Sequence, residues 1–525
     1  MSELLSADFL MRLRSRDVLP SDSQTKSNSS SVYARRYVVQ KIANNGSTFL
    51  PNSEMRFRLT STQSGVVPSS LALRFHVSTN AGVGTTQYAL DSHPALAVIS
   101  RFRSFVAGGK AVDDVNYCNN LSHQLLEIDG NKNWVNGSGG VMLGSWKHNP
   151  LQFNRDQAQG NATAGATAVV ETENSCWNRF PTACQTHEVG AGGTGGIDCV
   201  VPLSLLGCSL ASQNSILNLR AMGVMEFVIT LSSVEKAIAV AMPNLAGGAP
   251  VNGVPSFTIT QPHLMATMVD FNSDYMRLLD NAVEGSVGIR YPLKCYNVQQ
   301  QGSVQAPART RKDYVFSGAY RAVEDLTIWK THPQVDDIVP VPAVANTPAC
   351  AFALSTSRNG NQNHFRVNIS GRNYPDFDAL TNNAQTYWYN QEGLATLNNY
   401  THSTGCNDNS KWRGSAHNIT TTAVAGTGGA TAPIVMNANQ TLRSSFQMLQ
   451  SFRTARNAKN IDLQGADLSL AGSVIRISVD DNDGSAPIGA PVAGSGSGSN
   501  NQALYCAFRH TRLMSLANGE LQVEY

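Results

Sequence analysis

The chain has 525 residues, which is too long for one ordinary core and suits two domains of about 200–250 residues, a size that all-β domains often reach. Only 14% of the residues are charged, and Gly, Asn, Ser, Thr and Ala are abundant, which favours short strands joined by uncharged loops and argues against a helical protein. The formal net charge of +2, with no block of like charges, excludes the clustered basic face of a protein that holds nucleic acid by its phosphates.

The N-terminal segment, residues 1–33, is predicted to be a flexible arm. Leu5, Phe9 and Leu13 recur at helical spacing, but residues 20–31 are almost entirely polar and offer nothing to bury. Such a segment either orders against a partner or stays disordered.

The next segment, residues 34–271, reads as a first all-β domain. Apolar and polar residues alternate in 54–59 and 71–77, the period of a strand with one buried face. Asn119-Asn120 is expected to cap a short helix that carries Leu121, Leu125 and Leu126. Residues 130–196 are predicted to be a long loop, after which strands are expected at 197–203 and 223–231.

A connecting helix is predicted at residues 272–286, between the two halves. Asn272 or Ser273 suits its N-cap, and Gly285 stands where a left-handed residue ends a helix. An apolar stripe lies between them, made of Tyr275, Leu278, Leu279 and Ala282.

Residues 287–525 read as a second all-β domain with the same layout. Asn382-Asn383 is expected to begin a helix that carries Tyr387 and Trp388. Strands are predicted at 287–296, 470–479, 504–508 and 520–525, with long polar loops at 400–435 and 482–502.

An internal sequence repeat indicates that the chain contains two versions of one domain. The segment that begins at Phe102-Arg103 recurs 263 positions later at Phe365-Arg366, and Phe, Arg, Gly, Asp, Asn and Asn coincide without a gap. Six identities alone could arise by chance, so the repeat depends on the shared strand pattern. It predicts that Phe102 and Phe365 lie on equivalent strands, and that Asn119 and Asn382 begin equivalent helices.

Nine cysteines are scattered without paired spacing, and the chain starts without a signal-peptide pattern. Both observations indicate synthesis in a reducing compartment, in the cytoplasm and not for secretion. Four of the cysteines are expected in apolar strand-like runs, where Cys behaves as a small hydrophobe. They are Cys199, Cys208, Cys295 and Cys506.

No motif predicts chemistry, so no catalytic, cofactor-binding or metal-binding residue is assigned. The glycine-rich stretch 190–195 follows a loop instead of a strand, and 481–484 lacks the ligands that complete a calcium loop. The cluster of Cys176, Cys184 and His187 fits no familiar zinc spacing. Asp113-Asp114 and Asp376 each follow a glycine turn, which explains them as turn residues. The sequence therefore predicts a protein that is not an enzyme and needs no cofactor.

Three segments resemble double jelly-roll major capsid proteins of polinton-like viruses, virophages and related double-stranded DNA viruses. The first runs from Cys199-Val200-Val201-Pro202-Leu203 through the strand 224–231. The second is the helix 273–285 leading into 289–292, and the third is the C-terminal stretch 512–523. The resemblance implies an all-β fold of two tandem eight-stranded jelly-roll sandwiches, with short inserted helices and long loops.

The resemblance also implies a function in assembly. Three copies would form a homotrimer whose six jelly rolls make a nearly hexagonal block, and such blocks would tile the icosahedral shell of a virion. Penton proteins, minor capsid proteins and an inner membrane are further candidate partners, and no sequence-specific nucleic acid is implied. The sparse charge fits faces covered by neighbours, although a large soluble β-protein with polar loops would look much the same.

Two other functions fit a pair of sandwiches. A jelly-roll carbohydrate-binding protein would normally carry a signal peptide and an aromatic-rich binding face, whereas aromatic residues make up only 7% of this chain. A viral minor capsid or spike protein is the second alternative, which a tandem repeat of full jelly rolls disfavours.

Overall fold

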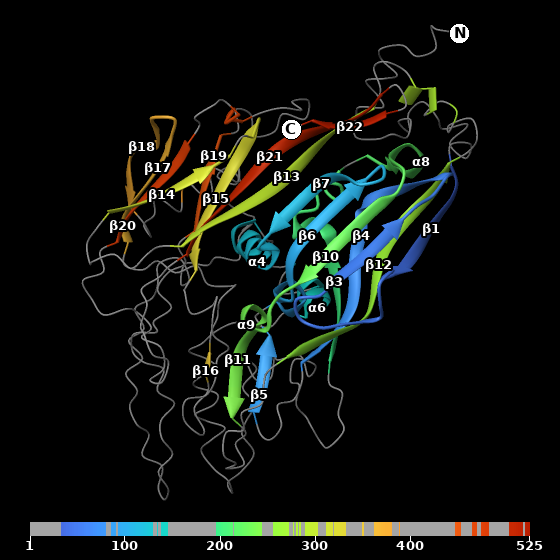
Figure 1. Cartoon of the computed structure of the whole chain (residues 1–525), viewed down its shortest axis with the longest axis horizontal. Coiled ribbons are helices and arrows are strands. Elements are labelled where there is room, and N and C mark those ends of the chain that lie inside the picture. Colours follow the sequence, from blue (N-terminus) through green and yellow to red (C-terminus); the bar gives the residue numbers. More distant parts are fainter. Residues whose placement is uncertain are drawn as a thin grey trace, which may run out of the picture.

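The computed structural model describes residues 33–271 and 289–524, together with five helical residues between 277 and 284. Gaps interrupt the description, and the longest are 145–195, 244–255, 332–348, 389–446, 453–464 and 482–502. The described residues form two β-sandwiches that lie side by side (Figure 1).

The first sandwich is made of two antiparallel sheets. One sheet has the strand order β1 (Tyr33–Ile42), β12 (Phe257–Phe271), β4 (Ser64–Thr79) and β8 (Ile197–Pro202). The short strands β2 (Thr48–Phe49) and β9 (Leu217–Asn218) extend it. The facing sheet has the order β3 (Glu54–Leu59), β10 (Met225–Leu231), β6 (Ile99–Val106) and β7 (Lys110–Asn116).

The second sandwich repeats this arrangement. Its first sheet has the order β13 (Ile289–Gly302), β21 (Ala503–Ala517), β15 (Val323–Thr331) and β19 (Gln447–Ser451), with β22 (Glu520–Glu524) paired to β21. Its facing sheet has the order β14 (Arg311–Ser317), β20 (Val474–Asp481), β17 (Gln362–Ile369) and β18 (Arg372–Leu380).

The two sandwiches have the same topology. If the eight main strands of each half are numbered along the chain, both halves have one sheet in the order 1-8-3-6 and a facing sheet in the order 2-7-4-5. Eight strands in two sheets are the jelly-roll arrangement. The predicted fold, two tandem jelly rolls, is confirmed.

The internal repeat corresponds to one hairpin in each sandwich. Phe102 lies on β6 and Phe365 on β17, the fourth main strand of each half, so this prediction is confirmed. The hairpin turns also match, because Ala107 and Ser370 both have positive φ angles and each is followed by a glycine. Asn382 lies outside the described residues.

The alternation of apolar and polar residues explains why strands of the first sandwich bury one face in the core. On β3, Met55, Phe57 and Leu59 are fully buried, while Arg56 and Arg58 between them are exposed. The burial of every second side chain is expected of a strand with one face on a core. Two apolar clusters result, and the larger one includes residues from both halves of the chain.

The helices are short apart from α4 (Cys118–Asp129), which buries Leu121 and Leu126 as predicted. The helix begins at Cys118, so Asn119 lies within its first turn and is not its cap. Between the halves, the described residues of 277–284 are helical. The remaining short helices are α3 (Pro94–Ala97), α6 (Ser138–Leu143), η3 (Leu203–Leu206), α8 (Leu219–Met222) and α9 (Val234–Ala237).

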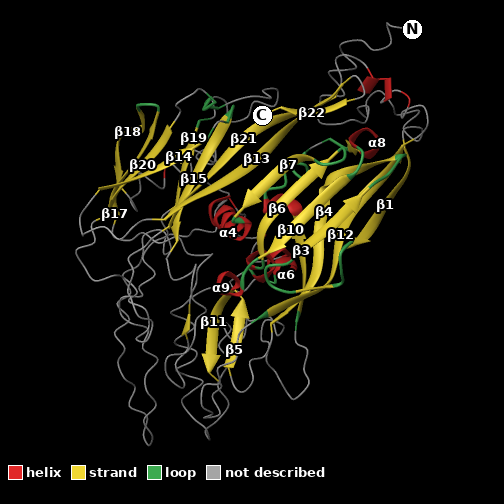
Figure 2. Ribbon diagram, in the orientation of Figure 1, coloured by secondary structure: helices red, strands yellow, loops and turns green. Residues whose placement is uncertain are grey.

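A small third sheet projects from one end of the sandwiches (Figure 2). It has the strand order β16 (Ala349–Cys350), β11 (Ile238–Pro243) and β5 (Thr86–Leu90). Because Val240 of the first half pairs with Cys350 of the second half, the two halves build this projection together.

Candidate assembly surfaces

An aromatic stack joins the two sandwiches inside the chain. Trp329 and Tyr505, on neighbouring strands of the second sandwich, lie with their rings 5° from parallel and 5.4 Å apart. Tyr117, at the end of β7 in the first sandwich, meets the ring of Tyr505 edge-on at 5.3 Å. Trp329 and Tyr505 are fully buried, and they belong to the apolar cluster that both halves share. The junction is therefore a continuous core and not a hinge.

Hydrogen bonds to backbone carbonyls reinforce this junction. Arg512 Nη1 donates to the carbonyl of Val112, and Gln213 Nε2 donates to the carbonyl of Pro292, both over 2.8 Å. The ammonium group of Lys110 donates to the carbonyl of Leu521. The donors lie on both sandwiches, since Arg512 belongs to the second and Gln213 and Lys110 to the first. The bonds therefore fix the orientation of β7 against β13, β21 and β22.

A buried carboxyl group lies beside the junction. Asp113 is 2% exposed on β7, where its Oδ2 accepts hydrogen bonds from Ser104 Oγ at 2.7 Å and from the amide of Ser209 at 3.1 Å. Burial raises the pKa of Asp113, and these hydrogen bonds oppose the rise. The interpretation of Asp113 as a turn residue is wrong, since its side chain points into the core.

Four of the buried cysteines have no acidic thiol. Burial raises the pKa of Cys118 to about 12 and raises the pKa values of Cys208, Cys295 and Cys506. Such thiols stay protonated and act as small apolar side chains. Cys208 follows η3 and does not lie on a strand, which corrects that prediction.

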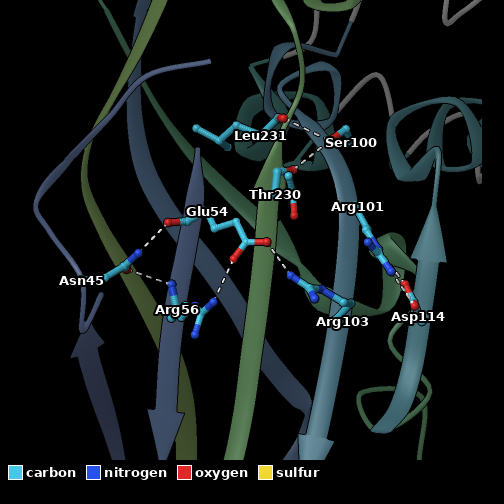
Figure 3. Close-up of polar contacts among 9 residues, drawn as sticks. All are labelled: Asn45, Glu54, Arg56, Ser100, Arg101, Arg103, Asp114, Thr230 and Leu231. Atoms are coloured by element: carbon cyan, nitrogen blue, oxygen red, sulfur yellow. Dashed lines mark hydrogen bonds and ion pairs between the residues drawn. The ribbon is translucent and has the colours of Figure 1, made fainter. Parts of the chain in front are cut away.

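The outer face of the sheet β3-β10-β6-β7 carries a network of charges (Figure 3). Glu54 accepts hydrogen bonds from Arg56 at 3.1 Å and from Arg103 at 2.5 Å, so it links β3 with β6 across β10. Arg101 donates two hydrogen bonds to Asp114 at 2.8 and 2.7 Å, and the bond to Asp114 raises the pKa of Arg101. This polar face is suited to water or to a polar neighbour.

The edge strand β1 presents a different surface. Val38 is 66% exposed and Ile42 is 68% exposed, next to the exposed basic residues Arg35, Arg36 and Lys41. Its counterpart in the second sandwich, β13, buries Leu293 and Cys295 almost completely. Tyr37 and Val39 of β1 are partly buried against the core, so β1 turns one face inward while Val38 and Ile42 remain exposed.

The described residues show no grouping that suggests catalysis. No three His, Cys, Asp or Glu residues of this part of the chain gather where they could hold a metal ion. The stretch 190–195 and the cluster of Cys176, Cys184 and His187 lie outside the described residues, as do 482–484. Asp481 ends β20. Among the described helices, none has the length and apolar character needed to cross a membrane.

The sequence pattern does not distinguish the junction residues from other buried strand residues. Trp329, Tyr505 and Arg512 lie on strands whose alternation predicts burial but not the partner that buries them. Nothing in the local pattern distinguishes a side chain that faces its own sandwich from one that faces the other.

Comparisons with known proteins place this fold among viral capsid proteins. No family model and no curated protein matches the sequence. The Faustovirus major capsid protein superposes with a TM-score of 0.50 and 8% identity, covering 92% of this chain and 90% of that one. A chain in the cryo-EM structure of the Sputnik virophage has a TM-score of 0.49 and 11% identity (94% and 89% covered). The mavirus major capsid protein has a TM-score of 0.46 and 10% identity (94% and 90% covered). The chain has the double jelly-roll fold of the Faustovirus major capsid protein.

Proposed function

We propose that this chain is a major capsid protein, which forms homotrimers that tile an icosahedral virus shell. The observation that carries the proposal is the same eight-strand topology in both halves, shared along nearly the whole chain with the Faustovirus major capsid protein. The role is structural, so no catalytic residue, cofactor or metal is part of it.

The internal junction supports assembly into a pseudo-hexagonal block. Two sandwiches of equal topology are held by a shared core, so each chain supplies two similar units in one fixed orientation. Three such chains around a threefold axis place six similar units in a ring. A block of nearly hexagonal outline can tile a flat lattice although its true symmetry is threefold.

The proposal divides the chain into four parts. Residues 1–33 form an arm that contacts neighbours, 34–271 form the first jelly roll, 272–286 form the connecting helix, and 287–525 form the second jelly roll. The protein is made in the host cytoplasm and resides in the virion. Penton and minor capsid proteins, and an inner membrane, are the further partners.

Light scattering of the purified protein tests the trimer. A trimer of a 56.3 kDa chain has three times that mass, about 169 kDa. Deletion of residues 1–31 is expected to leave the trimer intact, while particles seen by electron microscopy become fewer or incomplete. A well-folded protein that remains a monomer at micromolar concentration contradicts the proposal.

A further inference from the structure

We propose that side-chain amides close the edge of the second main strand in each sandwich, β3 and β14, so that no strand of another copy pairs there. The amides belong to Asn45 and Gln301. The inference goes beyond the proposed function, because it concerns edges through which copies are kept from joining. It applies equally to a trimer and to a monomer.

Strands β3 and β14 occupy equivalent edges of the two sandwiches. Each stands at the end of its sheet, and among the described strands β3 pairs only with β10 and β14 pairs only with β20. In an antiparallel strand, every second residue directs its backbone N–H and C=O groups away from the paired neighbour. An uncovered edge of this kind is a template on which a strand of another chain can pair.

Asn45, in the turn after β1, covers this edge in the first sandwich (Figure 3). Its Nδ2 donates to the carbonyl of Glu54 at 2.6 Å, and its Oδ1 accepts from the backbone amide of Arg56 at 3.1 Å. The backbone amide of Asn44 donates to the carbonyl of Arg56 at 2.8 Å. A side-chain amide offers the same donor and acceptor as a peptide group, so Asn45 takes the place of a peptide unit of a neighbouring strand.

Gln301, near the end of β13, covers the equivalent edge in the second sandwich. Its Nε2 donates to the carbonyl of Val315, and its Oε1 accepts from the backbone amide of the same residue at 2.9 Å. Two positions earlier on β13, Gln299 Nε2 donates to the carbonyl of Ser317 at 2.5 Å. In both sandwiches the covering amide therefore comes from the end of the first main strand or from the turn after it.

The exposure of these edges shows what the amides add. Asn45, Arg56 and Val315 are exposed, so water could bond to the same backbone groups and the amides are not needed to satisfy them. An amide instead supplies a neighbour that a strand from another copy has to displace. Charged side chains elsewhere on the two edges, the exposed Arg58 and Asp313, also oppose strand pairing.

Hydrogen exchange, read at single backbone amides by mass spectrometry, tests the covers in the wild-type protein. The amides of Arg56 and Val315 are expected to exchange roughly 2–10-fold more slowly than in an unfolded peptide, the effect of one net hydrogen bond on an opening equilibrium. Asn45→Ala should remove the protection of Arg56 alone, and Gln301→Ala that of Val315 alone, so each variant is the control for the other. Exchange of both wild-type amides at the rates of an unfolded peptide overturns the inference.

The second test asks whether an opened edge is used. The double variant Asn45→Ala with Gln301→Ala is expected to aggregate about tenfold faster than the wild type, with the infrared signature of strand pairing between chains. Gln40→Ala is the matched control, because Gln40 is exposed on β1 and its side chain makes no hydrogen bond among the described residues. A double variant that aggregates no faster than Gln40→Ala overturns the inference. If the double variant does not fold, exchange in the wild type decides, and the mass of the wild type tests the proposed function separately.

Discussion

The guanidinium group of Arg512 donates a hydrogen bond to the carbonyl of Val112, 400 residues earlier in the chain, over 2.8 Å. This bond ties β21 of the second sandwich to β7 of the first. Since the apolar cluster around it contains residues of both halves, neither sandwich can lose its packing without exposing the other.

Trp329→Ala is expected to reduce the free energy of unfolding by about 3–5 kcal/mol, because it empties a fully buried site at the junction. Urea unfolding followed by circular dichroism measures the loss, and the wild type should unfold in a single transition. Trp388→Ala is the matched control, since Trp388 is 49% exposed, and its effect should stay within about 0.5 kcal/mol. Two separate wild-type transitions would show that the sandwiches are independent.

Glu54→Gln is expected to lower the free energy of unfolding by about 0.5–1 kcal/mol at low salt. The reason is that Glu54 accepts hydrogen bonds from both Arg56 and Arg103 on a partly exposed face. The cost should shrink in 1 M salt, where charges are screened over roughly 3 Å. Glu520→Gln on β22, an exposed position, serves as the comparison. An effect of Glu54→Gln that is unchanged by salt would mean that packing, and not charge, is responsible.

Stability is expected to fall as the pH drops from about 6.5 towards 4, because burial lowers the pKa of His510 to about 4. Above pH 6.5 both folded and unfolded states hold a neutral imidazole, so His510 adds no pH dependence there. Below pH 6.5 the unfolded state binds a proton that the folded state does not bind. The free energy of unfolding therefore falls by up to about 1.4 kcal/mol per pH unit. His510→Gln should flatten this slope in urea titrations between pH 7 and 4.5. An identical slope in the variant would assign the effect to other groups.

Gly207→Ala is expected to destabilise the first sandwich by about 2 kcal/mol. Gly207 has a φ of +79°, and an added Cβ would lie 3.2 Å from Val115 Cγ2, so backbone strain and crowding add together. Gly108→Ala is the matched control, because Gly108 has a φ of +76° with nothing within 4 Å of an added Cβ. Its cost should be about 1 kcal/mol, from strain alone. Equal effects in thermal unfolding would show that the crowding is relieved by small shifts.

Much of the fold follows from local patterns in the sequence. Alternation in 54–59 predicts β3 because a strand places every second side chain on the same face. The repeat around Phe102 and Phe365 predicts two versions of one hairpin, and the structure puts both on the fourth main strand of a sandwich.

The errors arise where tertiary contacts override local chemistry. Asp113 and Asp376 match in the sequence, yet Asp113 is buried against Ser104 and Ser209 while Asp376 is exposed. A carboxylate next to a glycine turn looks the same in both places, because only the neighbouring loop that carries Ser209 distinguishes them. The exposure of Val38 likewise depends on which strands lie nearby, and no local pattern reports it.

The small sheet β16-β11-β5 has a consequence for variation in this protein. Its central strand β11 is held on one side by its own half and on the other by Cys350 of the second half. A one-residue slip in either pairing turns every side chain of the slipped strand to the opposite face. A one-residue insertion or deletion inside β11 therefore disturbs both pairings at once, so a change within the first half alters a sheet that the second half also builds.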